Sequence, residues 1–155
     1  METSSEVLTP RWKPLRFHPK QYAMMKSDAR FIAAFCGRRS GKTELLGLRK
    51  PLMRIFKNPL SDGRYIFCEP TYRQAKQNLW GPLKKLIPKE WVAGKPAESE
   101  MIITLIWGAQ ILCVGMDTPE RVEGNHIDGI VLDEYAAMKG HVWEEHVLPG
   151  LQQLG

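Results

Sequence analysis

The chain has 155 residues, of which 43% are hydrophobic and 25% are charged, and its formal net charge is +5. These values are ordinary for one globular domain and exclude a disordered or low-complexity protein. No run approaches the roughly 20 apolar residues of a membrane span, and the N-terminus lacks the apolar centre of a secretion signal, so we expect a cytoplasmic protein without a membrane partner.

The first part of the chain predicts an arm followed by a short helix. Residues 1–16 are polar and basic with two prolines, which indicates a flexible basic arm ahead of a domain at 17–155. A helix is expected from Phe17 to about Lys26, with Pro19 in its first turn. Gln21 on this helix offers a donor and an acceptor that can read an adenine edge; a solvated surface glutamine is the alternative.

Residues 31–43, FIAAFCGRRSGKT, have the layout of a Walker A phosphate loop. An apolar run at 31–35 predicts a buried strand, and Gly41-Lys42-Thr43 is expected to open a helix. The first glycine is Gly37, one position later than the usual pattern places it. Backbone N–H groups of 39–43 can face phosphates, Lys42 can reach the β- and γ-phosphates, and Thr43 can ligate Mg²⁺. The alternative is a chance Gly-Lys-Thr at a basic helix start.

Later patterns alternate between strands and helices. Pro51 is expected to kink or split the helix at 44–57, and Gly81-Pro82 to interrupt a helix that Thr71 caps. A last helix should begin near Val142. Strands are expected at Arg64–Cys68, at 127–132, and in a hairpin formed by Met101–Ile106 and Gln110–Val114.

An apolar strand at 129–132 ends in two carboxylates, Asp133 and Glu134, the form of a Walker B motif. Asp133 can hold the water shell of Mg²⁺, and Glu134 can act as the general base on an attacking water. The alternative is an acidic pair that favours a helix start electrostatically. Together with the phosphate loop upstream, the pattern favours a magnesium nucleotide site in an open α/β sheet.

The cysteines, the histidines and a group of lysines give further expectations. The three cysteines lie in apolar runs and the four histidines have no ligand-like spacing with them, so buried thiols and no zinc site are expected. His141 and His146 are predicted to lie on the surface of the last helix. A basic surface could track DNA phosphates or could be a solvated helix face; its residues are Lys76, Lys84, Lys85 and Lys89.

The sequence resembles the ATPase domain of the large terminase subunit of tailed bacteriophages and prophages. Three segments carry this resemblance: CGRRSGKTE at 36–44, EPTYRQAK at 69–76, and TPERVEG at 118–124 leading into GIVLDEYA at 129–136. It implies an α/β fold of the ASCE type of P-loop NTPase, a mostly parallel sheet flanked by helices and incomplete at the C-terminus. The family's nuclease domain is not expected in this chain.

The resemblance also implies roles for single residues. Gln21 resembles the adenine-reading glutamine, and Arg39 or Arg38 resembles the arginine that senses the γ-phosphate. Many relatives have an arginine that acts in trans where Glu123 stands here, so Arg121 is the nearest substitute. The expected catalytic residues are Glu134, Lys42, Arg39 and Arg121; nucleotide binding is assigned to Gln21, Gly37, Arg38, Arg39, Ser40, Gly41, Lys42 and Thr43, and the metal to Thr43 and Asp133.

The function that the resemblance implies is a motor that couples hydrolysis of ATP, with Mg²⁺, to translocation of double-stranded DNA. Its partners would be further copies of itself in a homo-oligomeric ring, the portal protein and the small terminase subunit, in the cytoplasm of a bacterial host. Two alternatives stay open: a nucleotide-binding fragment that does not hydrolyse ATP, and a P-loop ATPase of the helicase or recombination type.

Overall fold

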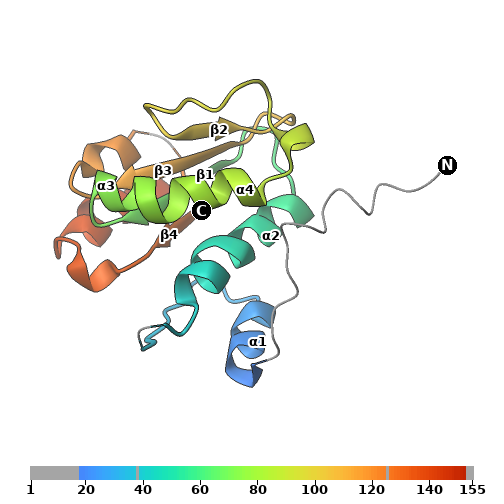
Figure 1. Ribbon diagram of the computed structural model, residues 1–155. Helices are drawn as coiled ribbons and strands as arrows, with labels where there is room; N and C mark the ends of the chain where they lie inside the picture. The colour runs from blue at the N-terminus through green and yellow to red at the C-terminus, as the bar shows by residue number, and fades with distance from the viewer. Residues whose placement is uncertain (1–17, 38, 125, 153–155) are drawn as a thin grey trace.

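The computed structural model describes residues 18–37, 39–124 and 126–152, and its ribbon is shown in Figure 1. The predicted arm at 1–16 lies outside the described residues. The strands are β1 (Arg64–Glu69), β2 (Ile102–Thr104), β3 (Gln110–Gly115) and β4 (Gly129–Leu132). The helical elements are α1 (Pro19–Lys26), η1 (Thr43–Arg49), α2 (Lys50–Lys57), α3 (Tyr72–Gln74), η2 (Ala75–Trp80), α4 (Gly81–Leu86), η3 (Lys89–Trp91), η4 (Pro119–Val122), η5 (Tyr135–Ala137), η6 (Val142–Val147) and α5 (Leu148–Gln152).

The four described strands form one sheet in the order β2-β3-β1-β4. β1 pairs in parallel with both β3 and β4, whereas β2 and β3 form the expected antiparallel hairpin. Parallel strands end at the same edge of a sheet, and Cys68 of β1 pairs with Leu132 of β4. The residues that follow, Glu69 and Asp133, therefore lie side by side at that edge.

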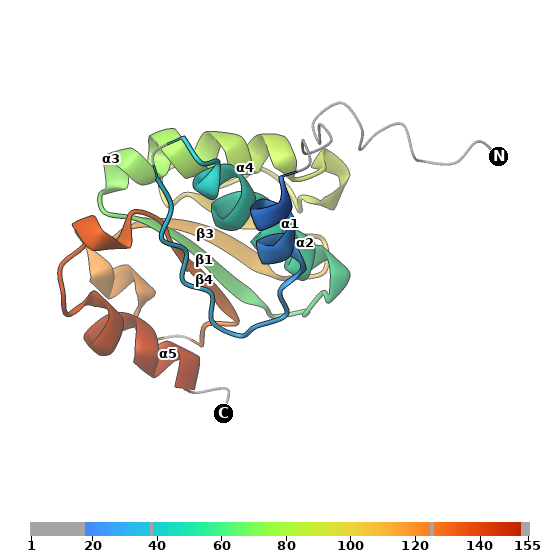
Figure 2. The ribbon, with the colours of Figure 1, turned by 90° about the horizontal axis from the view of Figure 1, so that it is seen from below.

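Helices cover both faces of the sheet because strand side chains alternate between the faces. Figure 2 shows α2 and α3–α4 on one side and α5 on the other. The first face contributes Tyr65, Phe67, Ile111 and Cys113 to a core with η1, α2, η2 and α4. The second face contributes Ile66, Cys68, Leu112 and Val114 to a core with Val122, Val142 and Val147. The predicted α/β class is confirmed.

The prediction that Pro51 and Gly81-Pro82 interrupt their helices was wrong in part. Pro51 lies in the first turn of α2, and η1 runs directly into α2 with Lys50 in helical backbone geometry. Gly81 likewise keeps helical dihedrals, φ −60° and ψ −52°, so η2 continues into α4. In both helices a π turn precedes the proline, and the hydrogen-bond register changes where the proline lacks its N–H. Thr71 caps α3 as predicted, accepting a hydrogen bond from the Gln74 N–H.

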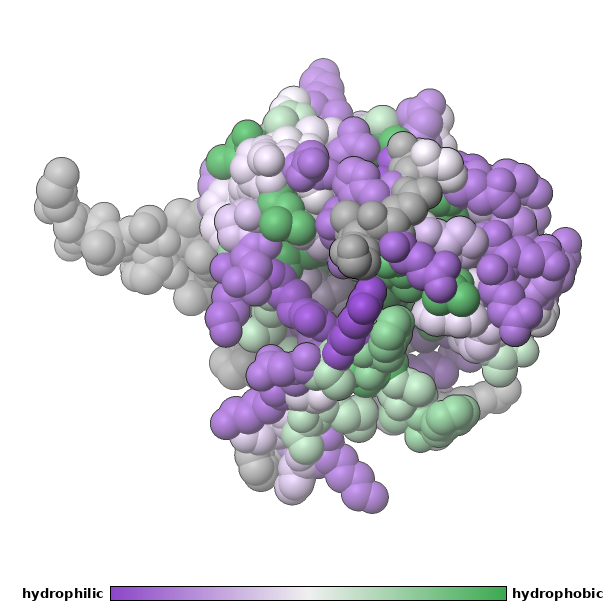
Figure 3. All heavy atoms as spheres, turned by 180° about the vertical axis from the view of Figure 1, so that it is seen from behind, coloured by the Kyte–Doolittle hydropathy of each residue, from purple (hydrophilic) through white to green (hydrophobic). Residues whose placement is uncertain are grey.

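The strand predicted at 31–35 was wrong. This segment has no regular secondary structure, and Phe31 and Phe35 are 59% and 100% exposed. It runs past β4 in Figure 2, and Figure 3 shows hydrophobic side chains in the lower half of the surface seen from behind. An apolar run becomes a strand only when a neighbour pairs with its backbone. β4 is the edge of the described sheet and lies beside the run, but no backbone pairing joins β4 to residues 31–35.

Among the described residues, no helix combines the length and apolar character that a bilayer crossing requires.

Gly115, the last residue of β3, is predicted to be intolerant of any side chain. A Cβ there would lie 2.0 Å from the backbone nitrogen of Tyr72 and 2.4 Å from the carbonyl carbon of Thr71. Backbone must then move, so we expect Gly115→Ala to destabilise the fold by about 1–3 kcal/mol in denaturant unfolding. Gly140→Ala is the matched control, because a Cβ there meets nothing within 4 Å. Equal stability of the two variants would contradict this packing.

Candidate nucleotide site

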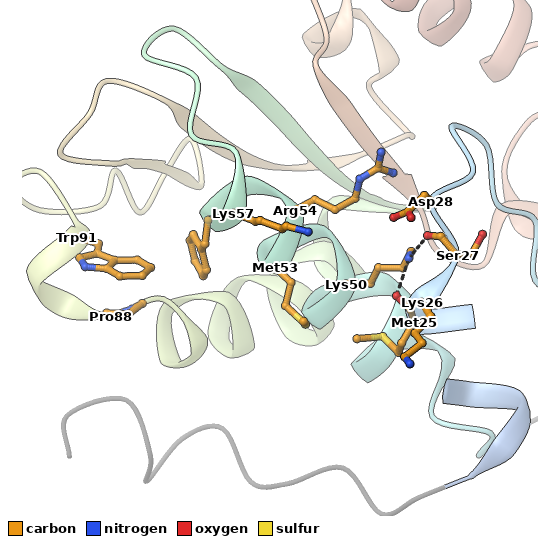
Figure 4. Close-up of a pocket in the computed structure, with 11 residues that line it drawn as sticks. Met25, Lys26, Ser27, Asp28, Lys50, Met53, Arg54, Lys57, Pro88 and Trp91 are labelled. Carbon is orange, nitrogen blue, oxygen red and sulfur yellow. Dashed lines mark hydrogen bonds between the residues drawn. The ribbon is translucent and has the colours of Figure 1, made fainter. Parts of the chain in front are cut away.

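Lys50 fastens α1 to α2 and so fixes α1 beside the residues that follow. Its Nζ donates to the carbonyl oxygens of Met25 at 2.9 Å and Ser27 at 2.6 Å, as Figure 4 shows. Burial lowers the pKa of this ammonium group. These contacts lie in a groove of about 800 Å³ between α1, α2 and η3. The groove contains none of the predicted phosphate-binding residues.

Gln21 of α1 lies directly against the phosphate loop. Its Nε2 donates a hydrogen bond of 2.7 Å to the carbonyl oxygen of Ser40. A Cβ on Gly41 would come within 3.3 Å of the same Nε2. Gln21, which lies sixteen positions upstream of Gly37 in the sequence, therefore contacts the loop itself, and its Oε1 is an acceptor suited to a further partner.

The loop turns into η1 through two left-handed residues, Arg39 at φ 61° and Gly41 at φ 77°. The N–H of Leu45 then bonds to the carbonyl of Gly41 at 2.9 Å, which begins the helix. The first N–H groups of a helix have no partner within it, so those of Lys42 and Thr43 remain available to an anion. The predicted helix start at Gly41-Lys42-Thr43 is confirmed, although the strand before it is not.

Thr43 and Asp133 meet although they are ninety positions apart. The Thr43 hydroxyl donates to Oδ2 of Asp133, and Oδ1 of Asp133 accepts from the Glu134 N–H at 2.9 Å. Asp133 is 8% exposed. A hydroxyl and a carboxylate held together in this way are hard oxygen donors, which is the ligand chemistry that Mg²⁺ selects. The residues present therefore fit the predicted metal.

Lys42 and Glu134 form an ion pair in this site. Lys42 Nζ lies 2.6 Å from Glu134 Oε1, and the two side chains are 28% and 52% exposed. The hydrogen bond from Lys42 to Glu134 raises the pKa of the ammonium group, with a smaller contribution from Asp133 and against the effect of burial. Glu134 has a left-handed backbone, φ 50°, at the turn after β4. The two residues with the largest predicted roles thus contact each other.

Sequence reasoning missed a third carboxylate, Glu69, at the end of β1. It is 1% exposed, Asn78 Nδ2 donates to its Oε1 at 3.1 Å, and its Oε2 is buried with no hydrogen-bond partner among the described residues. Burial raises the pKa of this carboxyl, and the charges of Asp133 and Glu134 act in the same direction. Its position at the carboxyl end of a parallel strand was the available signal.

Glu69 gives a pH-dependent stability prediction. A raised pKa in the folded state means that its stabilising neutral form is complete below the unfolded pKa of about 4.3 and is lost as the pH rises through the folded pKa. Glu69→Gln cannot titrate, so its stability relative to wild type should rise from pH 4 to pH 8 in denaturant unfolding. The exposed Glu90→Gln is the control. An equal difference at both pH values would contradict a costly buried charge.

Other predicted site residues have other surroundings. Arg38 lies outside the described residues, whereas Gly37 and Arg39 are exposed and Ser40 is half-buried. Arg121 Nη2 donates to the carbonyl oxygen of Glu100 at 2.6 Å, at the start of the hairpin. The structure thus gives the proposed trans arginine a partner away from the phosphate loop.

The structure also differs in part from the predictions of a basic surface and of three buried thiols. Lys84 pairs with Glu98 at 2.6 Å, and Lys76 lies over the Tyr72 ring. Cys113 is buried, which raises its pKa to about 12, whereas Cys36 is only half-buried. Two of the three thiols are therefore buried as predicted, the second being Cys68.

Comparison with known proteins gives one family and several similar folds. Residues 34–148 match the family model of the N-terminal part of the T4likevirus-type terminase large subunit. The large terminase ATPase domain of Thermus phage P74-26 superposes with a TM-score of 0.76 at 23% identity, and a variant of it with one arginine replaced by alanine gives 0.71, also at 23% identity. Each alignment covers 96% of this chain and 63% of the other.

The large terminase of the thermophilic bacteriophage D6E gives a TM-score of 0.60 at 16% identity, over 74% of this chain and 29% of that one. A search of curated sequences found no significant match. At these identities the solved structures show a shared fold, and the chain spans less than two thirds of their length.

Proposed function

Since the chain belongs to the family of T4likevirus-type terminase large subunits, whose N-terminal part it matches, we propose that it is the ATP-hydrolysing part of a DNA-packaging motor. The observation that carries the proposal is the meeting of the phosphate loop with the end of β4. Thr43 contacts Asp133 and Lys42 contacts Glu134, which supports the assignment of these four residues to one nucleotide site. The family match also favours this function over a helicase or recombination ATPase.

The chain's own residues divide the work of phosphoryl transfer. Lys42 and the N–H groups at the start of η1 bind the phosphates of ATP, and Thr43 with Asp133 holds Mg²⁺. When bound, the metal neutralises charge on the phosphates. Lys42 must exchange Glu134 for a phosphate, which frees the Glu134 carboxylate to accept the proton of the attacking water.

The remaining roles belong to Gln21 on α1 and to the other residues of the phosphate loop. Gln21 donates to Ser40 through Nε2, so its Oε1 can accept from the amino group of an adenine. Gly37, Arg38, Ser40 and Gly41 shape the loop around the phosphates, and Arg39, or Arg38, places a guanidinium near the γ-phosphate. Arg121 would act on the site of a neighbouring copy.

A second candidate function, nucleotide binding without hydrolysis, is favoured by one observation. Arg121 is held by the carbonyl of Glu100, so it must leave that partner before it can reach another subunit. Loss of an arginine that acts in trans can lower phosphoryl-transfer rates by about 10³- to 10⁵-fold. Binding without turnover at any protein concentration would support this second function.

The partners belong to the same proposal. The motor acts on double-stranded DNA as a homo-oligomeric ring, with the portal protein and the small terminase subunit, in the cytoplasm of the bacterial host. The lysines at 76, 85 and 89 could contact phosphates of the duplex without reading its sequence, and such binding weakens as salt is raised.

The experiment that tests the site is a calorimetric titration of the chain with a slowly hydrolysed ATP analogue, in Mg²⁺ and in EDTA. We expect one site per chain, with tighter binding in Mg²⁺ because Thr43 and Asp133 then contribute through the metal. Binding of equal strength in EDTA would contradict the role of this pair, and no binding in either buffer would overturn the proposed function.

A further inference from the structure

The helix that follows β4 carries a cluster of possible metal ligands outside the nucleotide site. Within the described residues, ligand atoms of His141, Glu145 and His146 all lie within 4.8 Å of one another. The sequence predicted no zinc site, because the histidines lack ligand-like spacing with the cysteines; this cluster contains no cysteine. The prediction that both histidines are surface residues was wrong for His146, whose side chain is 11% exposed.

The backbone of η6 explains why the two histidines meet. In an α-helix, residues five positions apart point about 140° away from each other. A π turn bonds residue i to residue i+5 and brings them to the same side. The N–H of Leu148 bonds to the carbonyl of Trp143, which is this pattern, and the rings of His141 and His146 have centroids 5.8 Å apart. π turns occur frequently at functional sites.

A second observation concerns the orientation of the His146 ring. Its Nδ1 contacts Oε1 of Glu123, from the residue after η4. When Nδ1 donates to this carboxylate, Nε2 is the ring nitrogen through which a neutral imidazole can bind a metal. A carboxylate on the outer nitrogen is the usual support of a metal-binding imidazole, because it fixes the tautomer and the ring orientation.

We propose that His141, Glu145 and His146 bind one divalent ion of the zinc class, with Glu123 supporting His146. Two imidazoles and a carboxylate form a donor set that suits Zn²⁺, whereas Mg²⁺ prefers oxygen ligands alone. The site is therefore separate in place and in chemistry from Thr43 and Asp133. An ion bound here would join the N-cap of η6 to its later residues, and Glu123 would connect His146 to the segment before β4.

The test uses the 155-residue chain without a histidine tag, stripped with EDTA and dialysed. Co²⁺ is titrated as a spectroscopic probe, Zn²⁺ affinity is measured by competition with a chromophoric chelator, and thermal melting follows Zn²⁺ addition. We expect one ion per chain and a higher melting temperature with Zn²⁺, because a ligand of the folded state stabilises it. His141→Gln and Glu145→Gln should each weaken binding by more than about tenfold.

Matched controls separate the cluster from ordinary surface groups. Glu144→Gln alters the neighbouring acid on the same turn, and His18→Gln removes a histidine elsewhere; both should bind as wild type does. His141 and Glu145 are exposed, so their variants should fold normally. Absence of binding at micromolar Zn²⁺, equal affinity in all variants, or half an ion per chain would overturn the proposal.

Discussion

Replacing Glu134 with glutamine is expected to lower the rate of ATP hydrolysis by about 10²- to 10⁴-fold, the usual contribution of a general base. The amide has nearly the shape of the carboxylate but cannot take a proton from water. Affinity for ATP should be retained or increased, because Lys42 no longer has to leave an ion-pair partner before it binds phosphate. The measurement is steady-state phosphate release together with calorimetric nucleotide binding.

Glu144→Gln is the control for this variant, since it removes an exposed carboxylate from η6 and leaves the nucleotide site unchanged. It should hydrolyse ATP at the wild-type rate. Turnover by Glu134→Gln within a few-fold of wild type would show that another group accepts the proton. Glu69, the buried carboxylate beside Asp133, would then be the first candidate to examine.

Replacing Lys42 with alanine is expected to lower turnover by about 10²- to 10³-fold, as removal of one preorganised charge stabiliser does in other enzymes. In contrast to Glu134→Gln, this variant should also lose nucleotide affinity, because the lysine contacts the phosphates in the ground state and in the transition state. The fold should be preserved, since the lost ion pair is partly exposed and contributes at most about 1 kcal/mol.

Lys95→Ala is the matched control, because Lys95 is an exposed lysine in the loop before β2. Its kinetics and its nucleotide binding should equal those of wild type. The two site variants together form a diagnostic pair: one keeps affinity and loses turnover, and the other loses both. Unchanged affinity in Lys42→Ala would mean that the phosphates bind elsewhere.

The sequence predicted well those elements that have a clear apolar pattern of their own or that depend on contacts between residues close in sequence. The strands at 64–69 and 129–132 are short apolar runs that end in acidic residues, and parallel pairing brings those ends to one edge. The cap at Thr71 was also predictable, because its side chain bonds to a backbone N–H only three residues away. These patterns place Asp133 and Glu134 at the carboxyl end of β4, beside the end of β1.

The features that could not be predicted depend on partners distant in sequence. The run at 31–35 has strand composition, but secondary structure requires a pairing neighbour that composition does not reveal. Pro51 was expected to disturb its helix, yet the helix continues because the hydrogen-bond register changes from π to α where the proline lacks its N–H. The Lys42–Glu134 ion pair joins positions more than ninety residues apart, and no local pattern reports such a contact.

The most direct test of the account is ATP hydrolysis by the wild-type chain, measured against protein concentration in Mg²⁺ and in EDTA. We expect hydrolysis in Mg²⁺ alone, with a specific activity that rises with protein concentration if an arginine is supplied by a neighbouring copy. Hydrolysis that proceeds equally in EDTA, or no hydrolysis at any concentration, would contradict the claim that Lys42, Thr43, Asp133 and Glu134 form an ATPase site.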